Sequence, residues 1–142
     1  MEFVPAGEII GKQHQVRTVG LKQSPHLPDG DYTFVDTYCI DASCDCRRTL
    51  IQVLHDGVHV STIGFGWESP SFYNDWMGVT PDEDDMPQLD GATIDISSPN
   101  KVSPQSMIGF FDTLLDEKWI NVFKRNYAAV KKKLKSPKKK KK

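Results

Sequence analysis

The sequence lacks any long hydrophobic run, and we therefore expect no membrane-spanning segment. No uninterrupted apolar stretch reaches the ~18 residues that a transmembrane helix needs. The N-terminal residues also lack a basic region followed by an apolar run, so no signal peptide is expected. A chain of 142 residues is one domain's worth, and we expect a cytoplasmic protein whose thiols stay reduced.

Acidic residues are missing from the C-terminal part of the chain. All 19 acidic residues lie at or before Glu117, together with six basic ones, and this part carries a formal charge of −13. The last 25 residues contain 12 basic residues and carry +12, so the net charge of −1 hides a strong asymmetry. The distribution of charge therefore says more about partners than the isoelectric point does.

Several catalytic and binding motifs are also absent. No serine stands in a nucleophile-elbow context, and no glycine-rich loop suited to phosphate appears. The acidic run 82–85 lacks the ligand spacing and the glycine of a calcium loop, so we interpret it as a solvated loop. The sequence names no reaction, and whether the protein is an enzyme stays undecided.

Cysteine is scarce, but the three cysteines lie close together. Cys39, Cys44 and Cys46 fall within eight residues. An odd number of cysteines in a reducing compartment argues against a disulfide framework. Thiolates bind soft metal ions, and zinc is the commonest metal at sulfur-rich sites, so we predict a zinc site. Inert buried thiols and redox-active thiols remain the alternatives.

The residues around the cysteines predict strands. Residues 32–38 are rich in aromatic and β-branched side chains, and Asp56-Gly57 joins the apolar runs 49–55 and 58–65 in a hairpin pattern. Cys39 then ends one strand, and Cys46 leads into the next. The loop at this end of the sheet would bring the three sulfurs onto one ion. Further strands are expected at residues 9–10, 16–21 and 92–96, and a helical turn at 72–77.

The three cysteines leave the fourth ligand of a tetrahedral zinc ion to be identified. His55 and His59 flank the turn at the opposite end of the hairpin, roughly 30 Å of strand away from Cys46, and are excluded as ligands. If His55 pairs with Val58, Thr49 pairs with Gly64, and the continued ladder brings Glu68 beside the cysteine loop. We predict Glu68 as the fourth ligand. Asp41, Asp45, His26 and water remain alternatives.

The neighbouring charged residues are expected to support the metal. Three thiolates on one Zn²⁺ leave a net charge of −1, which a guanidinium can offset while it donates hydrogen bonds to sulfur. Arg47 and Arg48 directly follow Cys46, and Asp45 directly precedes it. We therefore predict that Asp45, Arg47 and Arg48 surround the metal ligands without binding the ion.

Two helices are predicted at the C-terminus. Ser103-Pro104 is a typical helix start, and the first helix should run to about Asp116. The second, from about 118 to 135, has an apolar stripe that docks on the domain. Its opposite side is basic and is predicted to face solvent and to contact polyanions weakly; the residues are Lys124, Arg125, Lys131, Lys132 and Lys135.

These elements predict an α+β fold, an antiparallel sheet of four or five strands with two C-terminal helices packed on one face. Residues 1–135 would form a single domain that contains the cysteine loop. Residues 136–142 would form a disordered poly-lysine tail, because like charges repel one another.

The cysteine segment resembles that of a family of uncharacterised bacterial proteins. The shared pattern is Tyr38-Cys39, four residues, and then Cys44-Asp45-Cys46-Arg47-Arg48, with Phe65-Gly66-Trp67-Glu68 further on. The match spans about residues 32–127. The resemblance implies a small module with metal-ligand cysteines and implies no activity.

Three functions follow as hypotheses. The first is a structural zinc site that pins the loop between two strands of a binding or interaction module with an unknown partner. The second is a metal-dependent enzyme with an open coordination position near Glu68. The third is nonspecific binding of nucleic acid, or of another polyanion, through the basic C-terminal helix and tail.

Overall fold

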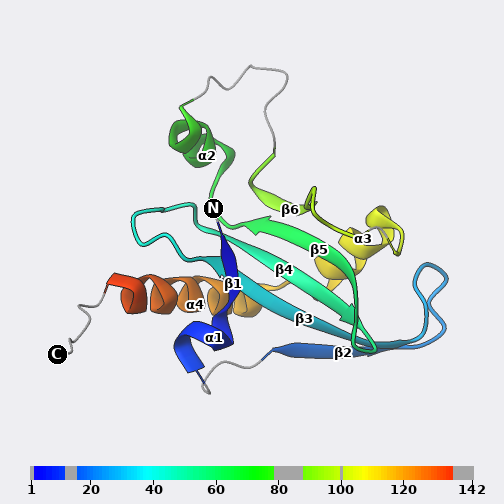
Figure 1. Ribbon diagram of the computed structural model, residues 1–142. Helices are drawn as coiled ribbons and strands as arrows, with labels where there is room; N and C mark the ends of the chain where they lie inside the picture. Colours follow the sequence, from blue (N-terminus) through cyan, green and yellow to red (C-terminus); the bar gives the residue numbers. More distant parts are fainter. Residues whose placement is uncertain (1, 12–15, 79–87, 100, 136–142) are drawn as a thin grey trace.

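One antiparallel sheet forms the centre of the protein. The computed structural model describes residues 2–11, 16–78, 88–99 and 101–135. Six strands pair in the order β1-β3-β4-β5-β6, and β2 pairs with β3 on the same edge as β1 (Figure 1). Their bounds are β1 Phe3–Pro5, β2 Arg17–Leu21, β3 Gly30–Cys39, β4 Arg48–His55, β5 Val58–Gly66 and β6 Gly91–Ile94.

The N-terminus contributes a strand that the sequence did not predict. β1 pairs with the last residues of β3, from Thr37 to Cys39, and β2 pairs with its first half. The prediction of a strand at residues 9–10 is wrong, because these residues end a short helix, α1 Ala6–Ile10. α1 buries Ala6 against Tyr38 and Val130, so packing overrides the β preference of paired isoleucines.

The predicted hairpin is confirmed, but its register differs. Asp56 (φ 48°) and Gly57 (φ 87°) both have positive φ, as a type I′ turn requires. The pairing shifts after Leu54–His59 to Val53–Ser61, so Val60 is an extra residue. Thr49 consequently pairs with Phe65 and not with Gly64, and the ladder ends at Arg48–Gly66.

Two helices cover one face of the sheet, as predicted. They are α3 Pro104–Leu114 and α4 Glu117–Lys135, and α2 Pro70–Met77 follows β5 at the edge of the sheet (Figure 1). The core is aromatic: Phe34 meets Trp119 of α4 edge-on at 5.5 Å, and Phe65 lies 5.9 Å from Phe111 of α3. Burying each such side chain contributes about 1.5–3 kcal/mol, which fixes both helices on this face.

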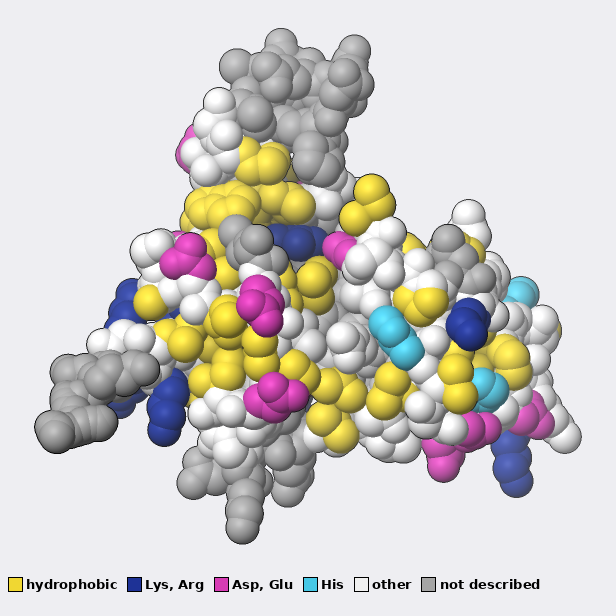
Figure 2. Space-filling view, in the orientation of Figure 1, with side chains coloured by type: hydrophobic (Ala, Val, Ile, Leu, Met, Phe, Trp, Pro, Cys, Tyr) yellow, Lys and Arg dark blue, Asp and Glu magenta, His cyan; other side chains and the backbone are white. Residues whose placement is uncertain are grey.

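α4 combines a buried face with a basic one. Trp119, Phe123 and Val130 are buried, and Lys124, Arg125, Lys132 and Lys135 are exposed. Lys and Arg side chains gather where α4 ends, at the left of Figure 2. The prediction that Lys131 faces solvent is wrong: it is 8% exposed, because its long side chain runs back to the cysteine loop.

Among the described residues, no helix has both the length and the apolar character needed to cross a bilayer. The acidic run 82–85 and the lysine run 138–142 both lie outside the described residues. The expected solvated loop and disordered tail therefore stay predictions.

Candidate metal centre

The three cysteines form one cluster at the end of the sheet. The Sγ atoms of Cys39, Cys44 and Cys46 all lie within 4.8 Å of one another, and none is in a disulfide. Sulfurs bound to one zinc at ~2.3 Å are about 3.8 Å apart in tetrahedral geometry, so a contraction of about 1 Å suffices. Cys39 and Cys46 are buried and Cys44 is partly exposed. The cluster therefore has the spacing and the donor chemistry of a metal site.

The backbone holds the cysteine loop (residues 40–47) at both ends. Cys39 is the last residue of β3 and pairs with Phe3, and the next amide, that of Ile40, donates to the Glu2 carbonyl at 3.0 Å. Within the loop, the Cys44 amide donates to the Asp41 carbonyl at 3.0 Å. These main-chain bonds hold the start of the loop beside β1 and close a turn within it.

Without a metal, the surroundings of Cys44 and Cys46 favour the neutral thiol. Burial, and then the neighbouring Cys46, raise the pKa of the Cys44 thiol to about 12. Burial also raises the pKa of Cys46, while a hydrogen bond from the Arg48 backbone acts in the opposite direction. Three thiolates this close repel one another, and a divalent cation removes that repulsion. The cluster would therefore release protons when it binds a metal.

Lys131 contacts the cysteine loop, which the sequence did not predict. Its Nζ donates to the carbonyl oxygens of Cys39 (3.0 Å) and Asp41 (2.8 Å), so α4 reaches across to the start of the cysteine loop. The ammonium also lies 5.4 Å from the centre of the Tyr127 ring. A lysine inside a run of surface lysines gives no sequence signal of its own. Only its position four residues after Tyr127, on the helix side next to the apolar stripe, sets it apart.

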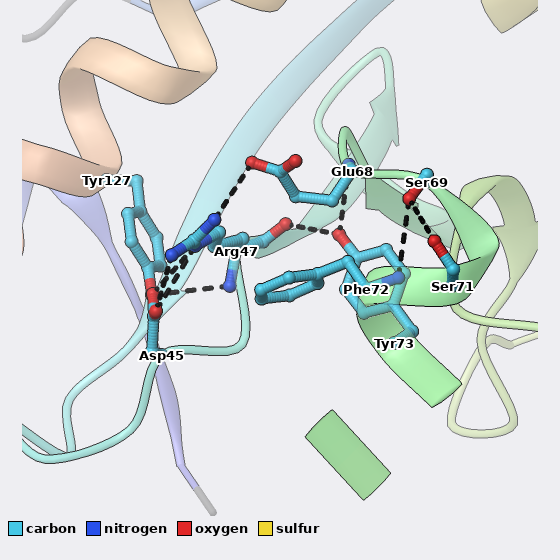
Figure 3. A network of polar contacts seen from close by, with 8 residues as sticks. All are labelled: Asp45, Arg47, Glu68, Ser69, Ser71, Phe72, Tyr73 and Tyr127. Atoms are coloured by element: carbon cyan, nitrogen blue, oxygen red, sulfur yellow. Dashed lines mark hydrogen bonds and ion pairs between the residues drawn. The ribbon is translucent and has the colours of Figure 1, made fainter. Parts of the chain in front are cut away.

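Arg47 connects the cysteine loop to α2 and α4 (Figure 3). Its guanidinium pairs with Asp45 (2.9 Å) and Glu68 (3.3 Å) and lies 4.4 Å from the centre of the Phe72 ring. The Tyr127 hydroxyl accepts from the Arg47 amide at 3.2 Å and donates to Asp45. The Arg47 guanidinium thus binds two carboxylates, and its predicted support of a bound metal stays a prediction.

The Arg48 side chain binds a backbone carbonyl, unlike that of Arg47, which binds carboxylates. Its Nε donates to the Leu89 carbonyl at 3.0 Å, and burial lowers the pKa of its guanidinium. The side chain lies so close over Gly64 that a Cβ there would be 2.6 Å from Nη2. Gly66 likewise leaves room for the Tyr73 hydroxyl and the Leu89 carbonyl. The two glycines that flank Phe65 thus permit the close approach of these neighbouring groups.

The candidate fourth ligands are engaged elsewhere. Glu68 accepts from Arg47, Asp45 from Arg47 and Tyr127, and Asp41 from the amide and hydroxyl of Ser43. His26 lies in the connection between β2 and β3, which precedes Gly30, and β3 then runs ten residues, roughly 30 Å, to Cys39. Within the described ranges, the group of close metal-binding residues holds the three cysteines alone. Glu68 as a ligand stays a prediction.

The two excluded histidines lie where expected, at the turn end of the hairpin. His55 Nε2 is 2.8 Å from the Asp29 carbonyl oxygen, and His59 Nε2 is 2.8 Å from Thr62 Oγ1. Both imidazoles thus have partners far from the cysteines.

Comparison with known proteins gives no match to a family model, to a curated protein or to a solved structure. The resemblance of the cysteine segment to a bacterial family therefore stays a prediction.

Proposed function

We propose that this protein binds one zinc ion through Cys39, Cys44 and Cys46, and that the ion fixes the loop between β3 and β4 as part of a binding module. The observation that carries the proposal is the approach of all three Sγ atoms to within 4.8 Å. Sulfur donors select soft or borderline ions, and zinc is the commonest of these in sulfur-rich protein sites. Free thiols also suit a cytoplasmic location, which is part of the same proposal.

Purified protein tests the proposal directly. Protein prepared without an affinity tag should contain about one zinc per chain by atomic emission. Cys44→Ser and Cys46→Ser should each lose most of the zinc, because three sulfurs are the whole set of close donors found in the described chain. Ala42→Ser, in the same loop, is the matched control and should retain the zinc. Metal-free wild-type protein that takes up no added zinc would refute the proposal.

The fourth ligand needs its own variant. Glu68→Gln removes the carboxylate charge but keeps a side chain that can accept a hydrogen bond from Arg47. If Glu68 binds the ion when the metal enters, the variant should bind zinc at least tenfold more weakly, and Asp41→Asn should not. Equal affinities of wild type and Glu68→Gln would leave the fourth position to water or to an outside donor.

An enzyme with an open metal position near Glu68 is the alternative. It requires Glu68 to act as a base on a metal-bound water. In the structure the Glu68 carboxylate is paired with the Arg47 guanidinium at 3.3 Å, so it already has a partner other than a metal-bound water. We therefore prefer the structural site.

The exposed side of α4 supports a second candidate function, weak and nonspecific binding of nucleic acid. Lys124, Arg125, Lys132 and Lys135 are exposed along this helix, and no acidic residue follows Glu117. Phosphate contacts of this kind depend strongly on salt. A triple variant, Lys124→Gln, Arg125→Gln and Lys135→Gln, should elute earlier from heparin and bind duplex DNA with a smaller salt slope.

A chain that ends at Lys135 separates the helix from the lysine run. This truncation preserves Lys131 and its contacts with the cysteine loop. If the truncated chain retains its salt-dependent binding and the triple variant loses it, α4 is the binding surface. Binding by the triple variant that equals wild type excludes the helix.

A further inference from the structure

We infer that Lys131 supplies the positive charge that balances a divalent metal in the three-cysteine cluster, so that it determines which ions the cluster holds. This inference rests on the proposed metal site and goes beyond it, because it assigns a role in selectivity to a residue of α4. Lys131 does not bind the ion. It acts on the site by position and by charge.

The first support is the geometry of the ammonium. Nζ is within 3.0 Å of the Cys39 carbonyl and 2.8 Å of the Asp41 carbonyl, which belong to one ligand and to the residue two positions beyond it. Its side chain is 8% exposed. A buried cation bound to the backbone carbonyl of a ligand cysteine is little screened by water, so its charge acts on the cluster.

The second support is that the neighbouring cations are committed elsewhere. The guanidinium of Arg47 pairs with Asp45 and Glu68, two carboxylates that together exceed its charge. The guanidinium of Arg48 donates to the Leu89 carbonyl. Lys131 and Arg48 both donate to uncharged carbonyl oxygens, but of the two only Lys131 binds the carbonyl of a cluster cysteine, Cys39.

The charge balance then distinguishes between ions. Three thiols that bind Zn²⁺ or Co²⁺ release three protons and leave a centre of charge −1, which one ammonium neutralises. Arsenous acid offers a neutral comparison, because As(OH)₃ and three thiols give As(SR)₃ and three waters, with no net charge on the centre. A cation beside the cluster should therefore favour the divalent ions and leave the arsenic(III) centre almost unaffected.

Two replacements separate charge from hydrogen bonding. Lys131→Gln keeps an N–H donor for the carbonyl oxygens and removes the charge. Lys131→Arg keeps both the donors and the charge. Lys118→Met, an exposed lysine of the same helix, is the matched control.

The experiment titrates each metal-free, reduced protein with Co²⁺, followed by sulfur-to-cobalt charge-transfer absorption, and separately with arsenite, followed by ultraviolet absorption of the As–S bonds. Lys131→Gln should bind Co²⁺ about 10- to 100-fold more weakly than wild type, the range found when outer residues of metal sites are changed, and should bind arsenite within about twofold of wild type. Lys131→Arg and Lys118→Met should bind both within about threefold.

Two results would overturn the inference. In the first, Lys131→Gln binds Co²⁺ as tightly as wild type, so the charge has no role. In the second, it loses Co²⁺ and arsenite affinity equally, so the lysine only holds the loop in shape. If Lys131→Gln does not fold, the Arg variant decides: loss of Co²⁺ affinity with retained arsenite affinity, despite the preserved charge, also contradicts the inference. Wild-type protein that binds neither ion instead refutes the metal site itself.

Discussion

At the residue scale, Arg47 has a left-handed backbone conformation, which is unfavourable for any residue other than glycine. Its φ of 49° lies in the left-handed region, which costs a residue with a Cβ about 1–2 kcal/mol. Contacts on both sides hold it there, since Tyr127 receives its amide hydrogen and the Tyr73 hydroxyl donates to its carbonyl at 2.7 Å. This conformation turns the chain from the cysteine loop into β4, so the direction of Cys46 depends on it.

Comparison of Arg47→Gly with Arg47→Ala isolates that backbone cost. Both variants lose the ion pairs and the contact with Phe72, but only glycine adopts positive φ without strain. We expect the alanine variant to be less stable than the glycine variant by about 1 kcal/mol in urea denaturation of the metal-free protein. Equal stabilities would mean that the left-handed conformation is not retained once the side chain is removed.

At the element scale, α4 is fixed to β3 by a buried polar contact as well as by its apolar stripe. Asn126 Nδ2 donates to Asp36 Oδ2 at 3.1 Å, and the Tyr38 hydroxyl donates to the same oxygen at 2.6 Å. Asn126 and Asp36 are 8% and 5% exposed. A buried carboxylate needs such donors, so this contact specifies which face of α4 meets the sheet.

We predict that Asn126→Ala destabilises the protein by about 1–3 kcal/mol, because it removes a donor from the buried carboxylate of Asp36. Asn121→Ala, at an exposed position of the same helix, should be neutral or slightly stabilising, since alanine is the better helix former. Thermal and urea unfolding of both variants measure the difference. An Asn126→Ala protein as stable as Asn121→Ala would show that the contact contributes nothing.

Local signals predicted the elements that they specify, and contacts between distant segments account for the rest. The Asp56-Gly57 turn, the Ser103-Pro104 helix start and the apolar stripe of α4 each depend on neighbours in sequence, and all three are confirmed. The strand β1 and the buried position of Lys131 depend on partners 36 and 92 residues away along the chain, through Phe3–Cys39 and Lys131–Cys39. No local pattern encodes such pairs.

In the candidate site, too, the sequence predicted the local part and missed the contacts between distant segments. The sequence placed three sulfurs in one loop at the end of two strands, and this required only the strand pattern on either side. The partners of Arg47 include Glu68, Phe72 and Tyr127, which reach the loop only after the sheet and α4 have assembled.

At the scale of the whole molecule, all four tyrosines link stability to alkaline pH. Burial is the largest cause that raises the pKa of each one: Tyr32, Tyr38, Tyr73 (to about 12) and Tyr127. Above pH 10 the unfolded chain ionises its tyrosines while the folded chain keeps their protons. The unfolded state then binds fewer protons than the folded state, so the free energy of unfolding must fall as pH rises.

The free energy of unfolding should fall steeply with rising pH, because several tyrosines contribute. A single group that stays fully protonated in the folded state, as we expect of Tyr38, costs about 1.4 kcal/mol of stability per pH unit above its unfolded pKa. We therefore predict that phenolate absorbance near 295 nm rises together with the loss of near-ultraviolet circular dichroism, in one transition well above pH 10. Tyr38→Phe should make the pH dependence shallower. Tyrosines that ionise near pH 10 in protein that stays folded would contradict the raised pKa of these four hydroxyls.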